Sequence, residues 1–232
     1  MATASTWQTG VVTAIGAETP HAKTFRLRLA EPRTHRAGQF YVVRLTAPDG
    51  YHAQRDYSVA NAPGGDDIEL TVEKLPDGEV SAFLHNDVEV GDVLQVRGPI
   101  GRFFSWDGAT PIVGVAGGSG VVPLMSMLRL ARRADRADLM RLIVSVRSPE
   151  ELYYADEIAG PETTVVYTRR ALERSSRPVG RLTVEDLAPL VEGDREVYVC
   201  GSQGFCDTAT SLLLGAGVET KRIRVSRFGP TA

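Results

Sequence analysis

The chain has 232 residues, of which 43% are hydrophobic and 24% charged, and its formal net charge is −3. A chain of this length is sufficient for two domains of about 110 residues each. The small negative charge argues against a nucleic-acid partner, because phosphate binding needs a concentrated basic surface. No apolar run approaches the ~20 residues that cross a bilayer, and the polar segment 1–7 is unlike a secretory signal. We therefore expect a cytoplasmic protein without membrane contact.

The sequence offers few metal ligands. Its two cysteines, Cys200 and Cys206, form a C-x5-C pair that matches neither a zinc site nor an iron–sulfur ligand set. We therefore expect no metal site, so that any metal centre would belong to a partner. Four scattered histidines are interpreted as solvated or packing residues: His21, His35, His52 and His85.

Short strands dominate the first half of the chain. In residues 24–29 and 68–75 apolar and polar side chains alternate, which buries one face of each strand. Similar runs separated by Gly, Pro and Asp occupy residues 11–15, 40–46, 57–60 and 93–97. About six such strands favour a small antiparallel β-barrel. The one helical segment expected in this half is 80–86.

The second half has a different pattern. Continuous apolar runs at residues 112–116, 142–146, 164–168 and 197–200 are each followed by helical spacing. This predicts βαβ units and a parallel sheet covered on both faces. We therefore expect two domains: an antiparallel six-stranded β-barrel in residues 1–107, then a Rossmann-like α/β parallel sheet in residues 108–232.

A glycine-rich loop follows the first apolar run of the second half. Gly117, Gly118 and Gly120 let the backbone turn tightly and approach a ligand. Such a strand, loop and helix can hold a pyrophosphate on the helix N-terminus, and Pro123 suits the first helical turn. An isolated Gly-Gly-x-Gly could equally be a plain tight turn. The strand–loop–helix context favours a nucleotide-binding loop.

The residues after the second apolar run bear on the choice of nicotinamide cofactor. Loops that select NAD offer Asp or Glu there for the ribose 2′-hydroxyl, whereas this strand ends in Arg147 and Ser148. A guanidinium suits a 2′-phosphate, because its planar fork donates two hydrogen bonds to phosphate oxygens. Arg169 and Arg181 follow at comparable strand or loop ends. Together they predict an anion pocket and NADPH as the nucleotide, with NADH a possible alternative.

A candidate flavin site lies in the barrel half. Arg55, Tyr57 and Ser58 combine a cation, an aromatic ring and a hydroxyl, and alternation puts Arg55 and Tyr57 on one face. About twenty residues later, Gly78 to Ser81 open the short helix and offer backbone N–H groups and a hydroxyl to a phosphate. Taken alone, the 55–58 segment could also be an ordinary edge strand.

These motifs, together with two others, resemble those of the ferredoxin–NADP reductase superfamily, in the family's order and over nearly the whole chain. The family's R-x-Y-S, G-x-x-S, G-P-x-G-x-F, glycine-loop and C-G motifs correspond to residues 55–58, 78–81, 98–103, 117–123 and 200–201. The resemblance implies an FAD-binding barrel followed by an NADP-binding domain. It also implies hydride transfer from nicotinamide C4 to flavin N5 without an acid or base from the protein.

The resemblance further implies roles for single residues. Tyr57 would lie against one face of the flavin ring, Ser58 would hydrogen-bond near N5, and Arg55 would pair with the FAD pyrophosphate. Cys200 would sit beside the nicotinamide, and Phe228 would cover the opposite flavin face. Further cofactor contacts are expected from Val72, Glu73, Lys74, Gly78, Val80, Ser81, Gly117, Gly118, Ser119, Gly120, Arg147, Ser148, Arg169, Arg181, Gly201 and Phe205. Tyr154 is either an adenine support or a packing residue.

The expected activity is that of a single-component reductase. Many larger relatives append a plant-type [2Fe–2S] domain, and this sequence has no such cysteine set, so electrons would pass from NADPH through FAD to a separate acceptor. That acceptor would be a ferredoxin-like carrier, an oxygenase or a molybdenum enzyme. Two alternatives are a free-flavin reductase and a non-catalytic electron-transfer subunit or nucleotide-sensing module.

Overall fold

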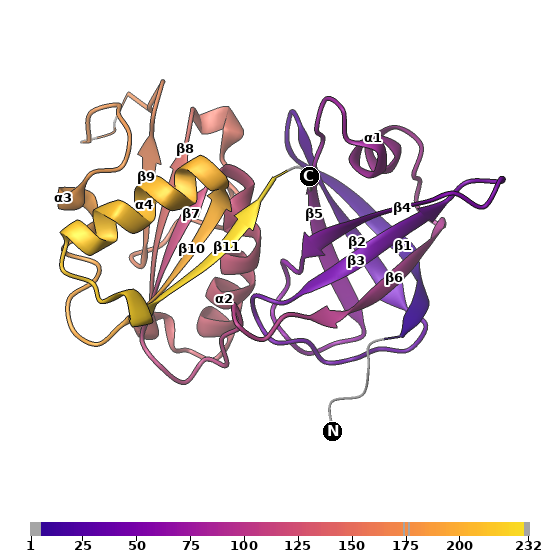
Figure 1. Ribbon diagram of the computed structural model, residues 1–232, viewed down its shortest axis with the longest axis horizontal. Coiled ribbons are helices and arrows are strands. Elements are labelled where there is room, and N and C mark those ends of the chain that lie inside the picture. Colours follow the sequence, from indigo (N-terminus) through magenta and orange to yellow (C-terminus); the bar gives the residue numbers. More distant parts are fainter. Residues whose placement is uncertain (1–5, 174, 176, 230–232) are drawn as a thin grey trace.

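The computed structural model describes residues 6–173, 175 and 177–229, which form two sheets side by side with helix α2 (Val121–Arg133) between them (Figure 1). One sheet is antiparallel with six strands and the other is parallel with five. The two-domain fold expected from the sequence, a barrel followed by a Rossmann-like α/β unit, is confirmed. Among the described residues, no helix is both long and apolar enough to span a membrane.

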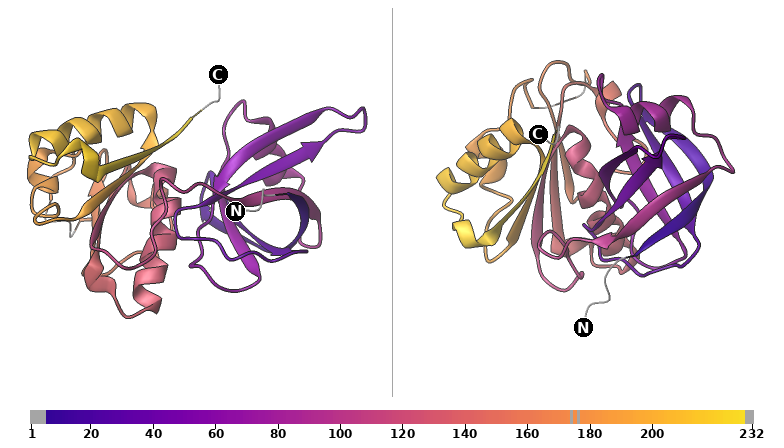
Figure 2. Two further views of the ribbon diagram at one scale, coloured as in Figure 1. Left: turned by 60° about the horizontal axis from the view of Figure 1, so that its bottom comes forward. Right: turned by 45° about the vertical axis from the view of Figure 1, so that its right-hand side comes forward.

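The first sheet curls into a barrel (Figure 2). Its strands are β1 (Trp7–Thr19), β2 (Ala22–Leu29), β3 (Phe40–Thr46), β4 (His52–Ser58), β5 (Asp67–Glu73) and β6 (Val93–Ile100). They follow the order β4-β3-β6-β1-β2-β5, and an antiparallel bridge between Val59 and Leu70 joins the two edge strands. Helix α1 (Glu79–Asn86) follows β5, as the sequence predicts to within one residue.

The barrel core follows from the alternation of side chains. In β2, Phe25, Leu27 and Leu29 are buried while Arg26 and Arg28 face outward. The other strands add aliphatic and aromatic side chains to the same core, and β3 and β5 each bury three consecutive residues. One face of β2 therefore contributes to the core and the other remains available for charged contacts.

The second sheet is parallel and has the order β11-β10-β7-β8-β9. Its strands are β7 (Ile112–Gly117), β8 (Met140–Val146), β9 (Thr163–Tyr167), β10 (Glu196–Ser202) and β11 (Ile223–Phe228). Its helices are α2 (Val121–Arg133), α3 (Val184–Leu187) and α4 (Gln203–Gly215), with short 3-10 turns η1 (Gly118–Gly120), η2 (Ala137–Leu139), η3 (Pro149–Glu151) and η4 (Thr220–Arg222). Because all strands are parallel, their carboxyl ends meet at one edge of the sheet.

Three expectations about these elements were wrong. A helix was expected after each parallel strand, but only η3 lies between β8 and β9, because Pro149, Gly160 and Pro161 interrupt that segment. Strand β11 was not expected, since polar residues separate its apolar ones. Strand β4 was expected at 57–60 but runs from His52 to Ser58, with Ala53 its one buried residue.

The two domains share a hydrophobic core. Buried side chains of α2 pack in one cluster with Ala22, Ala37 and Ala60 of the barrel half and with Phe104 and Trp106 of the connecting segment. The Phe104 ring also meets the Tyr198 ring edge to face, with centroids 5.2 Å apart. Helix α2 is thus buried on both sides, against its own sheet and against the barrel.

Candidate functional site

The glycine loop packs directly against the end of β10. An added Cβ at Gly120 would lie 2.1 Å from the Cys200 carbonyl oxygen, and one at Gly117 would lie 2.5 Å from the Phe205 ring. Gly118 has φ +54°, and a Cβ there would meet nothing within 4 Å. The loop therefore needs glycine for close packing on one side and faces open space on the other.

The C-G motif and its neighbours complete this edge of the sheet. Cys200 is fully buried, and burial raises the pKa of its thiol, which stays neutral. A Cβ at Gly201 would lie 2.7 Å from Phe205, so that ring lies against both Gly117 and Gly201. Phe228 pairs with Ser202 in the sheet register and packs against the cluster that contains Cys200.

Tyr153, which the sequence did not single out, connects the loop to the barrel. Its hydroxyl lies beside the Ser119 side chain, and Tyr153 is 4% exposed. Burial raises the pKa of Tyr153, and the Glu73 carboxylate of β5 raises it further. The loop therefore lies close to the carboxyl end of β5, where Glu73 and Lys74 are exposed and Val72 is buried. No periodic pattern marks Tyr153, because it lies in an irregular segment.

The 55–58 motif forms the end of edge strand β4. Arg55 and Tyr57 pair with Val43 and Tyr41 of β3, so they share one face as expected. Burial raises the pKa of Tyr57, an effect that the nearby Arg55 guanidinium opposes. Arg55 is exposed, and its Nη1 donates to Gln54 O at 2.7 Å. A guanidinium carries five N–H donors, so this one can also bind an anion.

The turn before α1 offers backbone donors. The first helical hydrogen bond runs from Ala82 N to Gly78 O at 2.7 Å, which leaves the N–H groups of residues 79–81 for a ligand. The N–H of Gly78 itself already donates to Leu75 O at 3.1 Å. The Ser81 hydroxyl accepts from Leu75 N at 3.2 Å and donates to Gly78 O at 3.1 Å, so it closes the turn. Val80 is 1% exposed and packs in the barrel core.

Three arginines predicted to bind a phosphate share the carboxyl edge of the parallel sheet. Arg169 N donates to Arg147 O at 2.9 Å, and Gly180, next to Arg181, donates its N–H to Tyr167 O at 3.0 Å. The main chain therefore brings together segments 147–148, 169–170 and 180–181. All three arginine side chains are exposed.

Two carboxylates that the sequence reading overlooked lie beside these arginines. Glu150 pairs closely with Arg170 and accepts from the Ser148 hydroxyl at 2.8 Å. The Arg170 hydrogen bond, with Ser148, lowers the pKa of Glu150 to about 2. Glu151 lies 3.9 Å from Arg147. The acidic pair follows Ser148 after one intervening proline, and it places negative charge beside the arginines of this edge.

Tyr154 is a packing residue. It is 5% exposed, its hydroxyl lies 2.6 Å from Thr71 Oγ1 of the barrel, and its N–H donates to Glu18 Oε2 at 3.1 Å. The Arg129 guanidinium lies over its ring, 5.1 Å from the centroid. These contacts hold Tyr154 in the domain interface, so the alternative of an adenine support is not needed.

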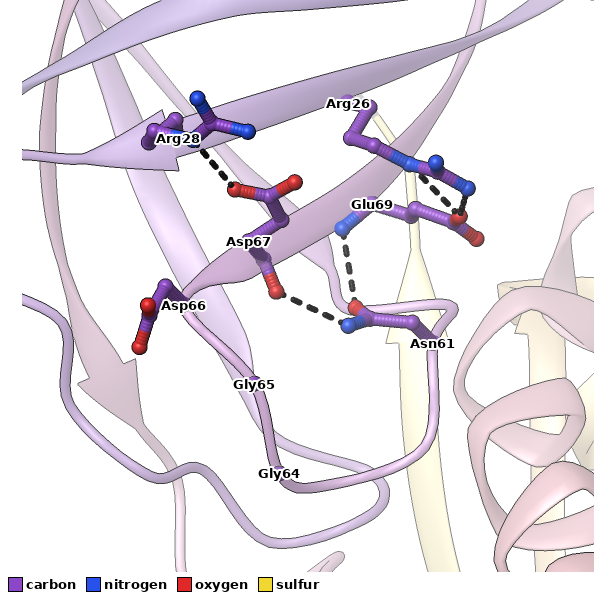
Figure 3. Close-up of a pocket in the computed structure, with 8 residues that line it drawn as sticks. All are labelled: Arg26, Arg28, Asn61, Gly64, Gly65, Asp66, Asp67 and Glu69. Carbon is purple, nitrogen blue, oxygen red and sulfur yellow. Dashed lines mark hydrogen bonds and ion pairs between the residues drawn. The ribbon is translucent and has the colours of Figure 1, made fainter.

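A separate cavity of about 370 Å³ lies at the other end of β5 (Figure 3). It is lined by Arg26, Arg28, Asn61, Gly64, Gly65, Asp66, Asp67 and Glu69. Arg26 pairs with Glu69 at 2.5 Å and Arg28 with Asp67 at 3.3 Å. These charged side chains pair with one another and every lining residue belongs to the barrel half, so we assign the cavity to the barrel and not to the nucleotide site.

The geometry defines a class of protein. A glycine cradle at a helix N-terminus fits a dinucleotide, and an exposed arginine with free backbone donors across the junction fits a second phosphate-bearing cofactor. Residues 10–105 match the oxidoreductase FAD-binding domain family, and residues 115–211 match the oxidoreductase NAD-binding domain family. The chain belongs to the ferredoxin–NADP reductase superfamily of oxidoreductases that carry these two domains.

Individual relatives agree with this placement. The chain is 33% identical over 219 residues to NADH oxidoreductase HCR of Escherichia coli, covering 93% of this chain and 66% of that protein. It is 28% identical to the reductase component of propane 2-monooxygenase from Rhodococcus jostii, covering 94% and 62%. It superposes with a TM-score of 0.83 and 26% identity on the flavohem-like FAD/NAD-binding domain of nitric oxide dioxygenase from Vibrio cholerae, covering 96% and 99%. The chain spans about two thirds of the length of these two curated relatives.

Proposed function

We propose that this chain is an NADPH-dependent flavoprotein reductase that passes electrons through bound FAD to a separate acceptor. The observation that carries the proposal is the 2.6 Å contact of the Tyr154 hydroxyl with Thr71 Oγ1 of β5, next to the buried Tyr153 beside the loop. This contact brings the nucleotide loop to the end of a barrel strand. Two cofactor rings held on the two sides of this junction can be stacked at about 3.5 Å, within the range of direct transfer. No general acid or base is required.

On the flavin side, the proposal assigns the pyrophosphate to Arg55 and to the backbone N–H groups before Ala82. Tyr57 supports one face of the flavin ring, and Ser58 lies at its polar edge. When bound, FAD accepts two electrons from the reduced nicotinamide and releases them singly, which supplies the redox chemistry. The chain's own residues bind, orient and shield the two rings.

On the nucleotide side, the proposal assigns the pyrophosphate to the N-terminus of α2 and the nicotinamide to the surroundings of Cys200 and Phe228. The 2′-phosphate is assigned to Arg147, Arg169 and Arg181, which are exposed at one sheet edge. The Glu150 carboxylate is already engaged by Arg170 and Ser148. It is therefore less free to accept a ribose 2′-hydroxyl, which favours NADPH over NADH.

The acceptor is proposed to be a separate one-electron centre. Several relatives are named as reductase components, such as those of propane 2-monooxygenase and of the naphthalene 1,2-dioxygenase/salicylate 5-hydroxylase systems. By this likeness the partner is an oxygenase or a ferredoxin-type carrier, and a molybdenum enzyme would serve the same chemistry. Such partners meet over small and transient surfaces.

The test is whether FAD is a bound group. The purified protein is expected to be yellow, with absorption at about 450 nm that stays with it through gel filtration. Arg55→Ala is expected to lose the colour, whereas Arg28→Ala, an exposed arginine on the outer barrel face, is expected to keep it. A wild-type protein that reduces added flavin but elutes colourless would instead be a free-flavin reductase.

A further inference from the structure

Helix α2 carries the nucleotide loop at its start and holds the barrel with its side. Ser126, Arg129 and Arg133 are spaced three and four residues apart, so they share one helix face. Ser126 Oγ donates to Asn61 O at 2.7 Å, Arg129 Nη1 donates to Ala60 O at 3.1 Å, and Arg133 donates to Pro63 O. Residues 60–63 begin two positions after Ser58.

Arg129 makes the strongest of these contacts. Its Nη1 donates to Glu69 Oε2 of the barrel at 2.7 Å, while Nε and Nη2 donate to the two Glu157 oxygens at 2.8 and 2.6 Å. The side chains of Arg129 and Glu69 are 20% and 13% exposed, so solvent screens this pair less than a surface pair. The guanidinium therefore bridges two carboxylates, one in each domain.

The barrel side of this bridge is itself rigid (Figure 3). Asn61 Oδ1 accepts from Glu69 N at 2.9 Å, and its Nδ2 donates to Asp67 O at 2.9 Å. Glu69 is also held by Arg26. The segment after the 55–58 motif is thus tied to β5, and both are tied to α2.

We propose that Arg129 is a positioning residue that fixes the distance between the nucleotide loop and the flavin motif. The expected effect on flavin reduction rests on the proposed function, whereas the expected effect on the placement of the two domains does not. The nucleotide loop lies at the N-terminal end of α2. The side of the helix is hydrogen-bonded to Ala60 and Asn61, close to Ser58 in the sequence. Removal of the guanidinium would let α2 shift against the barrel while each cofactor site remains intact.

Arg132 provides the matched control. It lies almost one turn further along α2, and its Nε donates to Glu162 Oε1 at 2.5 Å. It also donates to the carbonyls of Glu157 and Ala159 at 2.6 and 3.0 Å. All these partners lie in the parallel-sheet domain, so Arg132→Met removes an equally bonded arginine that makes no hydrogen bond to the barrel.

The geometric test uses spin labels on Val93→Cys in the barrel and Leu214→Cys in α4, which replace residues 59% and 46% exposed. The native Cys200 and Cys206 are fully buried and stay unlabelled. Arg129→Met is expected to broaden the distance distribution between the labels. Arg129→Lys, which keeps the positive charge, is expected to give a distribution nearly as narrow as that of the wild type. Arg132→Met is expected to leave the distribution as narrow as in the wild type. An unchanged distribution in Arg129→Met, or equal broadening in Arg132→Met, overturns the proposal.

The catalytic test measures flavin reduction at saturating NADPH. A misplacement of about 1 Å can slow such a step by about 100-fold, so Arg129→Met is expected to lower the rate 10- to 100-fold with nucleotide and flavin dissociation constants within about threefold. A wild-type rate in Arg129→Met contradicts the proposal. If wild-type flavin is reduced by neither nucleotide, the proposed function fails, and the label distances still decide whether the bridge holds the domains.

Discussion

Gly120 of the nucleotide loop lies against the carbonyl group of Cys200, with room for a hydrogen atom but not for a methyl group. A Cβ at Gly120 would come within 2.1 Å of that oxygen and 2.6 Å of Gly201 N. Backbone atoms on both sides make this contact, so no side chain can rotate away to relieve it. The loop and the C-G motif are therefore packed as one unit.

Gly120→Ala is expected to lower the free energy of unfolding by about 1–3 kcal/mol, the usual cost of overpacking, and to weaken nucleotide binding. Urea unfolding and nucleotide titration measure the two effects. Gly204→Ala is the control, because a Cβ there meets nothing within 4 Å and the residue lies in the first turn of α4. That variant is expected to be unchanged or more stable by up to about 1 kcal/mol.

Arg147→Ala is expected to weaken NADPH binding by roughly 1–3 kcal/mol and to leave NADH binding nearly unchanged, because only NADPH offers the 2′-phosphate. Titration of the oxidised protein with each nucleotide measures both constants. Arg141→Ala, at the opposite end of β8, should alter neither. Equal losses for NADPH and NADH would show that Arg147 does not contact the 2′-phosphate.

The raised pKa of the buried Tyr41 hydroxyl predicts how the free energy of unfolding changes at alkaline pH. Burial raises the pKa of Tyr41 to about 12, from an ordinary value of 10. The unfolded chain therefore loses this phenol proton first. The contribution of Tyr41 to the free energy of unfolding is fully present below pH 10 and is lost as the pH rises through 12.

Tyr41→Phe is expected to reduce the loss of stability between about pH 8 and about pH 11, as followed by urea unfolding. At about pH 8 the variant should be as stable as wild type or about 1 kcal/mol more stable. Among the described residues, the buried Tyr41 hydroxyl has no hydrogen-bond partner that the change would remove. A steeper loss in Tyr41→Phe than in wild type would contradict the assignment.

The two thiols are expected to be unreactive in the native protein. Cys200 and Cys206 are both free and fully buried, and burial raises the pKa of each. A disulfide reagent at about pH 8 should therefore modify neither thiol until urea is added, when both react. Rapid modification of one thiol in the native protein would mean that Cys200 or Cys206 is a thiolate or is exposed.

Local patterns predicted the fold well where apolar residues form a continuous run, as in β3, or alternate with polar ones, as in β2. Strand β3 runs over the predicted residues 40–46, and β2 begins two residues before the predicted start. The pattern failed at β4, whose residues are mostly polar, because an edge strand buries little. It also failed between β8 and β9, where irregular chain rather than a helix covers the sheet.

The residues of the candidate site also fall into those that the sequence identified and those that it did not. The motifs at Arg55 and Gly117 are contiguous in sequence, so local reading could find them. Tyr153 and Arg129 act through partners far along the chain, as in the Arg129 bond to Glu69 sixty residues earlier. Such pairings depend on how the two domains dock, and no periodicity encodes that.

The most direct measurement of the central claim is anaerobic rapid mixing of the FAD-loaded protein with NADPH deuterated at the transferred position. The account predicts that the flavin absorbance at about 450 nm falls in a single turnover, more slowly than with undeuterated NADPH. It also predicts half-saturation at a lower concentration of NADPH than of NADH. A flavin that stays oxidised with both nucleotides would contradict the account.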